Sequence, residues 1–149
     1  PHRLQPLGEK DGIKYYDDSI STICETTIQA LNTLKDVDTV LIGGMDRGID
    51  YSELINFLSG HKVPHIILME ATGKRILEEI LNGYPDFQDK DRLVLTDHLE
   101  DAVAKAKELT RPGHSCLMSP AAASYGIFKN FEERGEVFAR LVSGSDKLM

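Results

Sequence analysis

Residues 39–69, TVLIGGMDRGIDYSELINFLSGHKVPHIILM, decide the fold, because two apolar runs stand on either side of an amphipathic stretch. The runs at 39–42 and 65–69 are almost continuously apolar, which is typical of strands buried on both faces of a parallel sheet. The stretch at 52–58 between them predicts a helix. Two parallel strands joined by a helix form a right-handed crossover, so this segment predicts one βαβ unit of an α/β domain.

The same alternation of short apolar runs and longer amphipathic stretches continues along the chain. Two further strands are predicted, at Arg92–Leu95 and Ser115–Met118. Four further helices are predicted, at 25–34, 73–81, 99–109 and 127–142. In the last of these helices one apolar stripe is expected, formed by Phe128, Phe131, Phe138 and Leu141.

The N-terminal part of the chain has a different pattern. Apolar runs at 3–7 and 13–16 flank the segment Gly8–Gly12, and a glycine-containing connection of this length predicts a hairpin. We therefore expect a single Rossmann-like, three-layer α/β domain over residues 1–149. Its sheet should be mostly parallel, with the antiparallel N-terminal hairpin at one edge.

Composition excludes several classes of protein. The chain of 149 residues carries 17 Lys and Arg against 24 Asp and Glu, a net charge of −7, which excludes a strongly basic nucleic-acid binder. It has neither the roughly 20-residue apolar run of a membrane helix nor a secretory signal, so a soluble, cytoplasmic protein is expected. Cys24 and Cys116 lie far apart and outside any metal-ligand spacing, which predicts reduced thiols and no zinc site.

Candidate chemistry lies in three loops that follow predicted strands, because ligands bind at the carboxyl ends of strands in an open α/β sheet. The first loop, residues 16–22, ends in Thr22, which matches a capping box with Glu25. Two interpretations of Thr22 stay open. It caps the following helix, or its hydroxyl and the free N–H groups beside it attract a carboxylate or phosphate.

The other two loops also allow two interpretations each. In Gly43–Gly48, Arg47 either grips a carboxylate in bidentate fashion or is a solvated surface charge. Residues 119–131 either form a closely packed connection or present the hydroxyls of Ser119 and Ser124 to a ligand. Neither loop has the spacing of a dinucleotide site or a P-loop, and the chain has no GxSxG or HExxH motif. These loops therefore do not predict a hydrolytic site.

Read together, the loops resemble a known family. The matching segments are Pro1-His-Arg-Leu4, Asp18-Ser-Ile-Ser-Thr22, Gly43-Gly-Met-Asp-Arg-Gly-Ile-Asp50, and Ser119-Pro-Ala-Ala-Ala-Ser124 through Phe128-Lys-Asn-Phe-Glu-Glu-Arg-Gly135. They span almost the whole chain, which resembles the C-terminal domain of the Mur ligases that add D-glutamate. The start at Pro1, directly before a structured stretch, also suggests a piece of a longer chain, without its N-terminal UDP-binding and central ATPase domains.

The resemblance implies an ATP-dependent ligase of bacterial peptidoglycan synthesis, and so a role in cell wall biogenesis, cell shape and cell division. Such a ligase joins D-glutamate to UDP-N-acetylmuramoyl-L-alanine through an acyl phosphate, with the help of Mg²⁺. The resemblance implies that ATP and Mg²⁺ are held mainly by the central domain, so this chain should contain no metal ligand and no catalytic residue. Alone it should be inactive. The parent is expected to be monomeric, without nucleic-acid or membrane partners.

Residue by residue, the resemblance assigns seven positions. Arg3 and Asp18 match positions that contact the nucleotide. Five residues match positions around D-glutamate: Thr22, Arg47, Ser124, Tyr125 and Phe131. Of these, Tyr125 and Phe131 are expected to contribute main-chain contacts or packing more than side-chain contacts.

Two departures from the family pattern affect ligand geometry. Ile20 stands where members often have Lys, so a charge contact is lost there. Arg47 stands where several members have Lys, and it is still cationic but larger and planar. Other functions stay open at this point: a ligase adding another amino acid, a folylpolyglutamate ligase domain, or a stand-alone, non-catalytic flavodoxin-like binding module.

Overall fold

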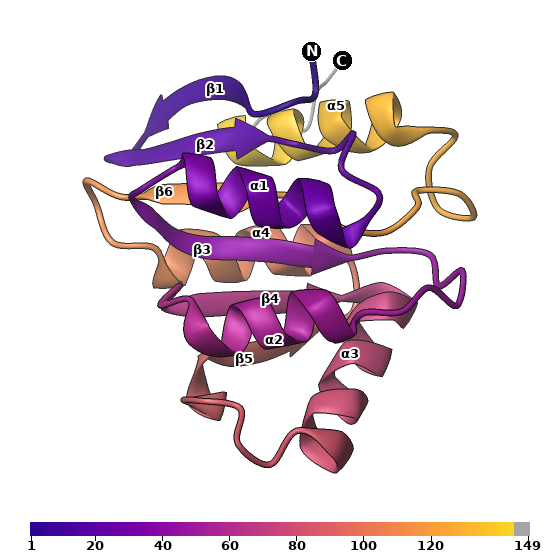
Figure 1. Ribbon diagram of the computed structural model, residues 1–149. Helices are drawn as coiled ribbons and strands as arrows, with labels where there is room; N and C mark the ends of the chain where they lie inside the picture. Colours follow the sequence, from indigo (N-terminus) through magenta and orange to yellow (C-terminus); the bar gives the residue numbers. More distant parts are fainter. Residues whose placement is uncertain (145–149) are drawn as a thin grey trace.

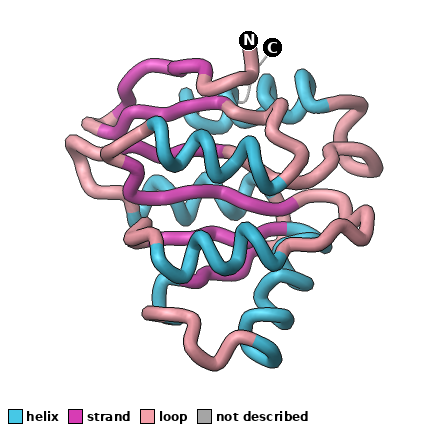
Figure 2. Tube along the Cα trace, viewed as in Figure 1, coloured by secondary structure: helices cyan, strands magenta, loops and turns pink. Residues whose placement is uncertain are grey.

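The computed structural model describes residues 1–144 of the chain (Figures 1 and 2). Its strands are β1 Gln5–Lys10, β2 Ile13–Asp17, β3 Val37–Gly43, β4 His65–Met69, β5 Leu93–Thr96 and β6 Ser115–Met118. Its helices are α1 Cys24–Thr33, α2 Ser52–Gly60, α3 Glu70–Gly83, α4 Leu99–Leu109 and α5 Phe131–Ser143, with a 3₁₀ turn at Lys90–Arg92. Within this part of the chain, no helix is long and apolar enough to cross a membrane.

The strands form one sheet in the order β1-β2-β6-β3-β4-β5. The β1–β2 pair is antiparallel, and every other neighbouring pair is parallel. Helices α1 and α2 cover one face, while α4 and α5 cover the other (Figure 1). The predicted Rossmann-like three-layer fold with an antiparallel hairpin edge is therefore confirmed.

Strand β3 lies in the middle of the core, and all seven of its residues are buried. Its side chains alternate between the two faces: Val40 and Ile42 pack under α1 and α2, whereas Leu41 packs on the side of α4 and α5. Because helices cover both faces, neither face of β3 needs polar side chains. This explains why residues 40–42 of the strand are all apolar in the sequence. The polar residues before them, Asp38 and Thr39, are also buried, and they accept hydrogen bonds from Arg111 and Thr110 at 2.7 Å each.

The hairpin is present, but its predicted Gly8–Gly12 loop is too long. The turn consists of Asp11 and Gly12 alone, with φ angles of 53° and 83°. Positive φ at both central positions of a two-residue turn matches the right-handed twist of a hairpin. Gly8, with φ of 97°, lies inside β1, where the pairing register shifts between Pro6 and Gly8. That glycine marks a bulge in the strand.

The predicted helix at 127–142 begins too early. Asn130 is the N-cap of α5, and its side chain accepts a hydrogen bond from the Glu133 N–H at 2.8 Å. Phe128 lies before the helix, so its assignment to the helical stripe is wrong. The predicted helix at 73–81 errs in the other direction, since α3 begins directly after β4 at Glu70.

Candidate functional site

The three loops singled out in the sequence lie side by side at the carboxyl-terminal end of the sheet. They follow β2, β3 and β6, which are neighbours in the order β2-β6-β3, and the loops gather at the carboxyl ends of these strands (Figure 2). Backbone hydrogen bonds join the loop after β6 to both others: Ala121 N–H donates to the Ser21 carbonyl at 2.9 Å, and Met45 N–H donates to the Ala123 carbonyl at 2.9 Å. The three loops therefore form one continuous surface.

Asp18 lies in the first of these loops, and its side chain is buried, with 2% exposed. Its carboxylate accepts hydrogen bonds from the Ser21 hydroxyl at 2.6 Å, the Ser119 hydroxyl at 2.7 Å and the Leu4 N–H at 3.0 Å. It thereby ties the N-terminal segment to two of the loops. Arg3, beside Leu4, is exposed and makes no hydrogen bond or ion pair within the described residues.

Thr22 does not cap a helix, so the predicted capping box with Glu25 is wrong. The first helical residue of α1 is Cys24, and the N-cap is Ile23, which is extended and makes no side-chain cap bond. Thr22 thus lies one residue too early to reach the free N–H groups as an N-cap. Its half-buried hydroxyl makes no hydrogen bond with residues 1–144.

Arg47 is exposed, and among the residues described it has no hydrogen-bond or ion-pair partner. The loop that carries it is fastened by Arg75 of α3, which sequence reasoning did not single out. Arg75 donates to both carboxylate oxygens of Asp46, at 2.8 and 3.0 Å, and to the Ile49 carbonyl at 2.8 Å. The hydrogen bond from Arg75 holds the pKa of Asp46 below its usual value. The unpaired guanidinium of Arg47 therefore lies on a loop that Arg75 holds in place through Asp46 and Ile49.

The loop after β6 is packed where it touches the sheet and exposed where it leaves it. Ala121, Ala122 and Ala123 are buried, and Ser124 is 6% exposed with a hydroxyl that bonds to none of the described residues. Tyr125 is 59% exposed. The interpretation as a packed connection is thus confirmed for residues 119–123. The predicted ligand contact is wrong for Ser119, whose buried hydroxyl donates to Asp18 at 2.7 Å, and it stays a prediction for Ser124.

Phe131 begins α5 and lies against the N-terminal segment. Its ring meets the imidazole of His2 edge to face, with centroids 6.1 Å apart. Its carbonyl accepts a hydrogen bond from the Ser19 hydroxyl at 2.7 Å. The side chain is therefore engaged in packing against His2, and a role of Phe131 beside D-glutamate stays a prediction.

Arg134 is a second functional candidate that sequence reasoning missed. Its side chain is almost fully buried, and it donates from Nε to the Ser19 hydroxyl at 2.9 Å and from NH2 to the Ser19 carbonyl at 2.8 Å. Burial lowers the pKa of this guanidinium to about 10. A spacing signal was present, because Arg134 follows Phe131 by three residues and precedes Phe138 by four, which places it on the inner face of the helix.

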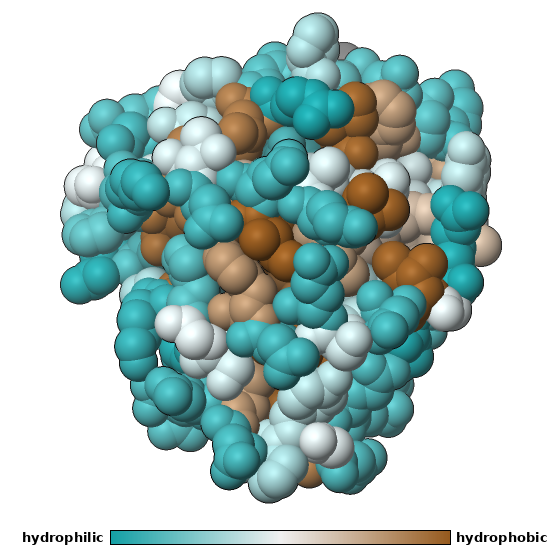
Figure 3. Space-filling view, in the orientation of Figure 1, coloured by the Kyte–Doolittle hydropathy of each residue, from teal (hydrophilic) through white to brown (hydrophobic). Residues whose placement is uncertain are grey.

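The loops at the carboxyl-terminal end of the sheet, and the residues next to them, also expose large apolar side chains. Ile23, Met45, Tyr125 and Ile127 are each more than 40% exposed. Figure 3 shows hydrophobic side chains interrupting the polar surface on this side of the molecule. Apolar side chains exposed on neighbouring loops are typical of an interaction face.

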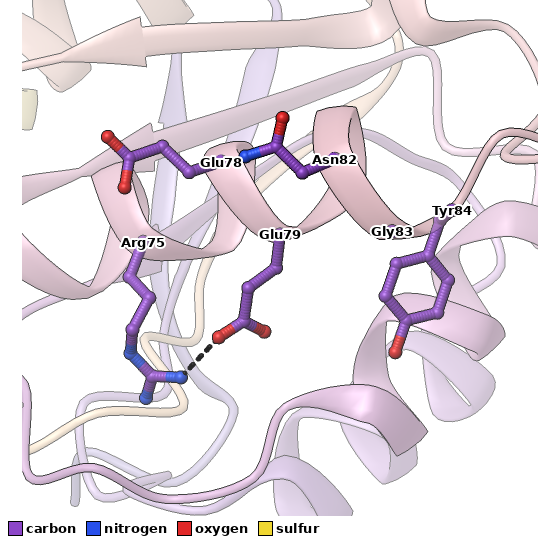
Figure 4. Close-up of a pocket in the computed structure, with 6 residues that line it drawn as sticks. All are labelled: Arg75, Glu78, Glu79, Asn82, Gly83 and Tyr84. Carbon is purple, nitrogen blue, oxygen red and sulfur yellow. Dashed lines mark hydrogen bonds and ion pairs between the residues drawn. The ribbon is translucent and has the colours of Figure 1, made fainter.

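A hollow of about 510 Å³ lies beside α3, next to the Arg75 side chain that also holds the loop of Arg47 (Figure 4). It is lined by Arg75, Glu78, Glu79, Asn82, Gly83 and Tyr84. Arg75 is already paired there with Glu79, at 2.7 Å between NH1 and Oε2, as well as with Asp46. No charged group is left free in it to select an anion, so we do not assign it a ligand.

The three neighbouring loops carry donors of the kind that bind small anions. Arg47, Thr22 and Ser124 each offer a donor without an internal partner, and they stand on three adjacent loops. A guanidinium and hydroxyl groups are suitable partners for carboxylates. Residues 1–144 contain no group of three His, Cys, Asp or Glu side chains placed to hold a metal ion.

Comparison with known proteins gives a consistent group of relatives. The chain is 39% identical over 142 residues to the UDP-N-acetylmuramoylalanine–D-glutamate ligase of Caldanaerobacter subterraneus, covering 95% of this chain and 30% of the relative. It is 36% identical over 148 residues to the same-named ligase of Chlamydia caviae, covering 99% of this chain and 33% of the relative. The chain thus spans about a third of the length of these relatives. No protein-family model matches it.

Two solved structures have a similar fold. One is a murein peptide ligase from Psychrobacter arcticus, with a TM-score of 0.61, 14% identity, and coverage of 95% of this chain and 30% of that one. The other is the MurF ligase of Thermotoga maritima in complex with ADP, with a TM-score of 0.55, 18% identity, and coverage of 97% and 32%. Both matches concern about a third of a longer chain.

Proposed function

We propose that this chain is the domain of a D-glutamate-adding Mur ligase that binds D-glutamate and closes over the nucleotide. The observation that carries the proposal is the set of three unpartnered donors, Arg47, Thr22 and Ser124, on adjacent loops. It is supported by 36–39% identity over 95–99% of the chain to ligases named for D-glutamate. D-Glutamate and UDP-N-acetylmuramoyl-L-alanine are the proposed substrates of the whole enzyme, together with ATP.

In this proposal each loop supplies one contact to D-glutamate. The Arg47 guanidinium takes one carboxylate in a bidentate pair, and the Thr22 and Ser124 hydroxyls bind the remaining carboxylate oxygens. Tyr125 and Phe131 line the same side through main-chain groups and packing. Holding the amino acid from three loops fixes where its amine points, which is what attack on an activated carboxyl group requires.

Nucleotide contact is assigned to the N-terminal segment. Arg3 is exposed and has no ion-pair partner in the described part of the chain, so its guanidinium is available to a phosphate. Asp18, the second proposed nucleotide residue, holds the same N-terminal segment in place, because its carboxylate accepts a hydrogen bond from the Leu4 N–H. The Asp18 carboxylate accepts three internal hydrogen bonds and keeps one acceptor site, but it is almost fully buried.

The remaining steps are assigned to parts of the ligase outside this chain. Residues 1–144 contain no cluster of three candidate metal ligands, and we assign no metal ligand here. We propose that a central domain holds ATP and Mg²⁺, that an N-terminal domain holds the UDP-sugar, and that the enzyme is cytoplasmic and monomeric. The exposed apolar side chains on the loops are then the surface that meets the central domain.

Replacing Arg47 by alanine tests the proposal. In the full-length ligase, Arg47→Ala should raise the KM for D-glutamate by about 10- to 100-fold, since a hydrogen bond to a charged group contributes about 1.5–3 kcal/mol. The KM for ATP should not change. Arg140→Ala, an exposed arginine near the end of α5, is the matched control and should behave as wild type. Unchanged KM and kcat for D-glutamate in Arg47→Ala would remove the carboxylate role.

A stand-alone flavodoxin-like module is not favoured. That function would not explain why nearly the whole chain is 36–39% identical to ligases named for D-glutamate. Selectivity among amino acids separates the D-glutamate ligase from ligases that add another amino acid.

A further inference from the structure

Arg134 lies at the point where the three loops meet, although none of the predicted contacts involves it. The side chain is 1% exposed and grips the loop after β2 with two hydrogen bonds to Ser19, one to its hydroxyl and one to its carbonyl. Ser19 in turn donates to the Phe131 carbonyl at 2.7 Å. The start of α5 and the loop that carries Thr22 are therefore joined through this one guanidinium.

The other end of the guanidinium faces the loop after β3, at Gly44. A methyl group placed on Gly44 would lie 3.2 Å from NH1 of Arg134 and 2.6 Å from the Ala123 carbonyl oxygen. NH1 is buried and has no hydrogen-bond partner among the described residues. Gly44 precedes Arg47 by three residues, and Ala123 precedes Ser124. Arg134 thus lies directly against the Gly44 backbone of the loop that carries Arg47, and Gly44 in turn lies against the loop that carries Ser124.

Its electrostatic surroundings do not explain why a charge is buried here. Glu70, Asp17 and Tyr51 favour the charged form from a distance, but no acidic oxygen in residues 1–144 lies within 4.0 Å of the guanidinium. A buried charge without a direct ion pair costs several kcal/mol. A hydrophobic side chain of the same volume would avoid this cost but would lose both hydrogen bonds to Ser19. What arginine provides here is therefore its hold on the Ser19 loop.

We propose that Arg134 is a positioning residue for the amino-acid substrate. It sets the loop of Ser19 and Thr22 against the loop of Gly44 and Arg47, and so fixes the separation of groups that hold the two carboxylates. Binding groups on different loops need placement to within about 0.5 Å to act together. This inference rests on the proposed function, because it concerns D-glutamate bound at the same three loops.

The planar fork of arginine is central to this role. Nε and NH2 reach the hydroxyl and the carbonyl of one residue, Ser19, while NH1 points away toward Gly44. A lysine ammonium keeps the charge but presents its donors from a single atom at the end of a flexible chain. It can keep one of these contacts, but it cannot hold both loops at a fixed separation.

The test uses steady-state kinetics of the full-length ligase that carries this chain. Arg134→Lys should raise the KM for D-glutamate about tenfold, as expected for the loss of one hydrogen bond from a charged group. Ser19→Ala should raise it about threefold, because this variant loses only the bond to the Ser19 hydroxyl and keeps the bond to the Ser19 carbonyl. The KM values for ATP and UDP-N-acetylmuramoyl-L-alanine should stay within twofold of wild type. Arg140→Gln, on the exposed side of the same helix, should change none of them.

Each outcome decides the proposal. A selective rise in the KM for D-glutamate in both variants supports it, and if Arg134→Lys does not fold, Ser19→Ala decides alone. An unchanged KM for D-glutamate, or a parallel change for all three substrates, overturns it and leaves Arg134 with a purely structural role. If Arg47→Ala responds and these variants do not, only the positioning role is wrong. If the wild-type ligase does not use D-glutamate, the proposed function itself is wrong.

Discussion

Gly43→Ala is expected to lower the free energy of unfolding by about 3–5 kcal/mol, which is a large part of the stability of an ordinary domain. Gly43 ends β3 with a φ of 133°, a conformation that side chains rarely adopt. A Cβ added here would overlap the Met69 carbonyl oxygen and lie 2.9 Å from the Met69 carbonyl carbon and nitrogen. All three are backbone atoms of the neighbouring strand β4, so the clash cannot be relieved by turning a side chain.

Urea unfolding of the wild-type and variant chains measures this effect. Gly60→Ala is the matched control, because Gly60 lies in α2 and nothing is within 4 Å of an added Cβ. Since alanine favours helix more than glycine does, the control should be neutral or stabilising by up to about 1 kcal/mol. Equal stability of Gly43→Ala and wild type would mean that β3 and β4 do not approach each other as closely as described.

Asp18→Ala is expected to be nearly as destabilising, by about 2–4 kcal/mol, because it leaves the Ser21 hydroxyl and the Leu4 N–H without an acceptor, while the Ser119 hydroxyl can still donate to Thr27 Oγ1 at 3.0 Å. The Ser21 and Ser119 hydroxyls and the Leu4 N–H all donate to this carboxylate, which is 2% exposed. Water cannot replace a buried acceptor at no cost, so each orphaned donor adds a desolvation penalty. Because the bonds join the N-terminal segment to two loops, we expect this segment and these loops to unfold first in the variant.

Thermal and urea unfolding again provide the measurement, with Asp86→Ala as the control, an exposed aspartate that makes no hydrogen bond within residues 1–144. The control should change stability by less than about 0.5 kcal/mol. If Asp18→Ala were as stable as Asp86→Ala, the buried carboxylate would not hold the loops, and a direct role toward the nucleotide would be the better explanation.

The sheet was predictable because its central strands are buried on both faces. The run at 65–69 coincides with β4, and the run at 115–118 coincides with β6. The resemblance to the D-glutamate-adding Mur ligases, predicted from the loop segments, is likewise confirmed by the relatives over almost the whole chain. Two kinds of signal, periodicity and loop composition, thus agree.

The errors come from local signals that tertiary contacts override. Gly8 was assigned to a turn, but it forms a bulge because β1 pairs with β2 through an irregular register. Thr22 was placed as a cap because its spacing to Glu25 fits, although the chain stays extended through Ile23. Phe128 was given to a helix by apolar spacing alone, whereas the cap at Asn130 begins α5 later.

Arg134 shows why site residues are harder to find than strands. In the sequence it stands among Glu132, Glu133 and Glu136, which read as a solvated face. Only the folded chain brings Ser19 within 2.9 Å of its guanidinium, across more than a hundred residues of sequence. The roles of Arg3, Thr22, Arg47 and Ser124 toward ligands stay predictions, supported by their placement and their free donors.

The most direct test of the proposed function is amino-acid selectivity. The full-length ligase would be supplied with ATP, Mg²⁺ and UDP-N-acetylmuramoyl-L-alanine, and the product formed from D-glutamate compared with that from L-glutamate, L-lysine and meso-diaminopimelate. We predict product with D-glutamate at a kcat/KM at least about 100-fold above the others, the scale of discrimination that unpaired polar groups produce. Preferred incorporation of any other amino acid, or none of D-glutamate, would contradict the assignment of these three loops.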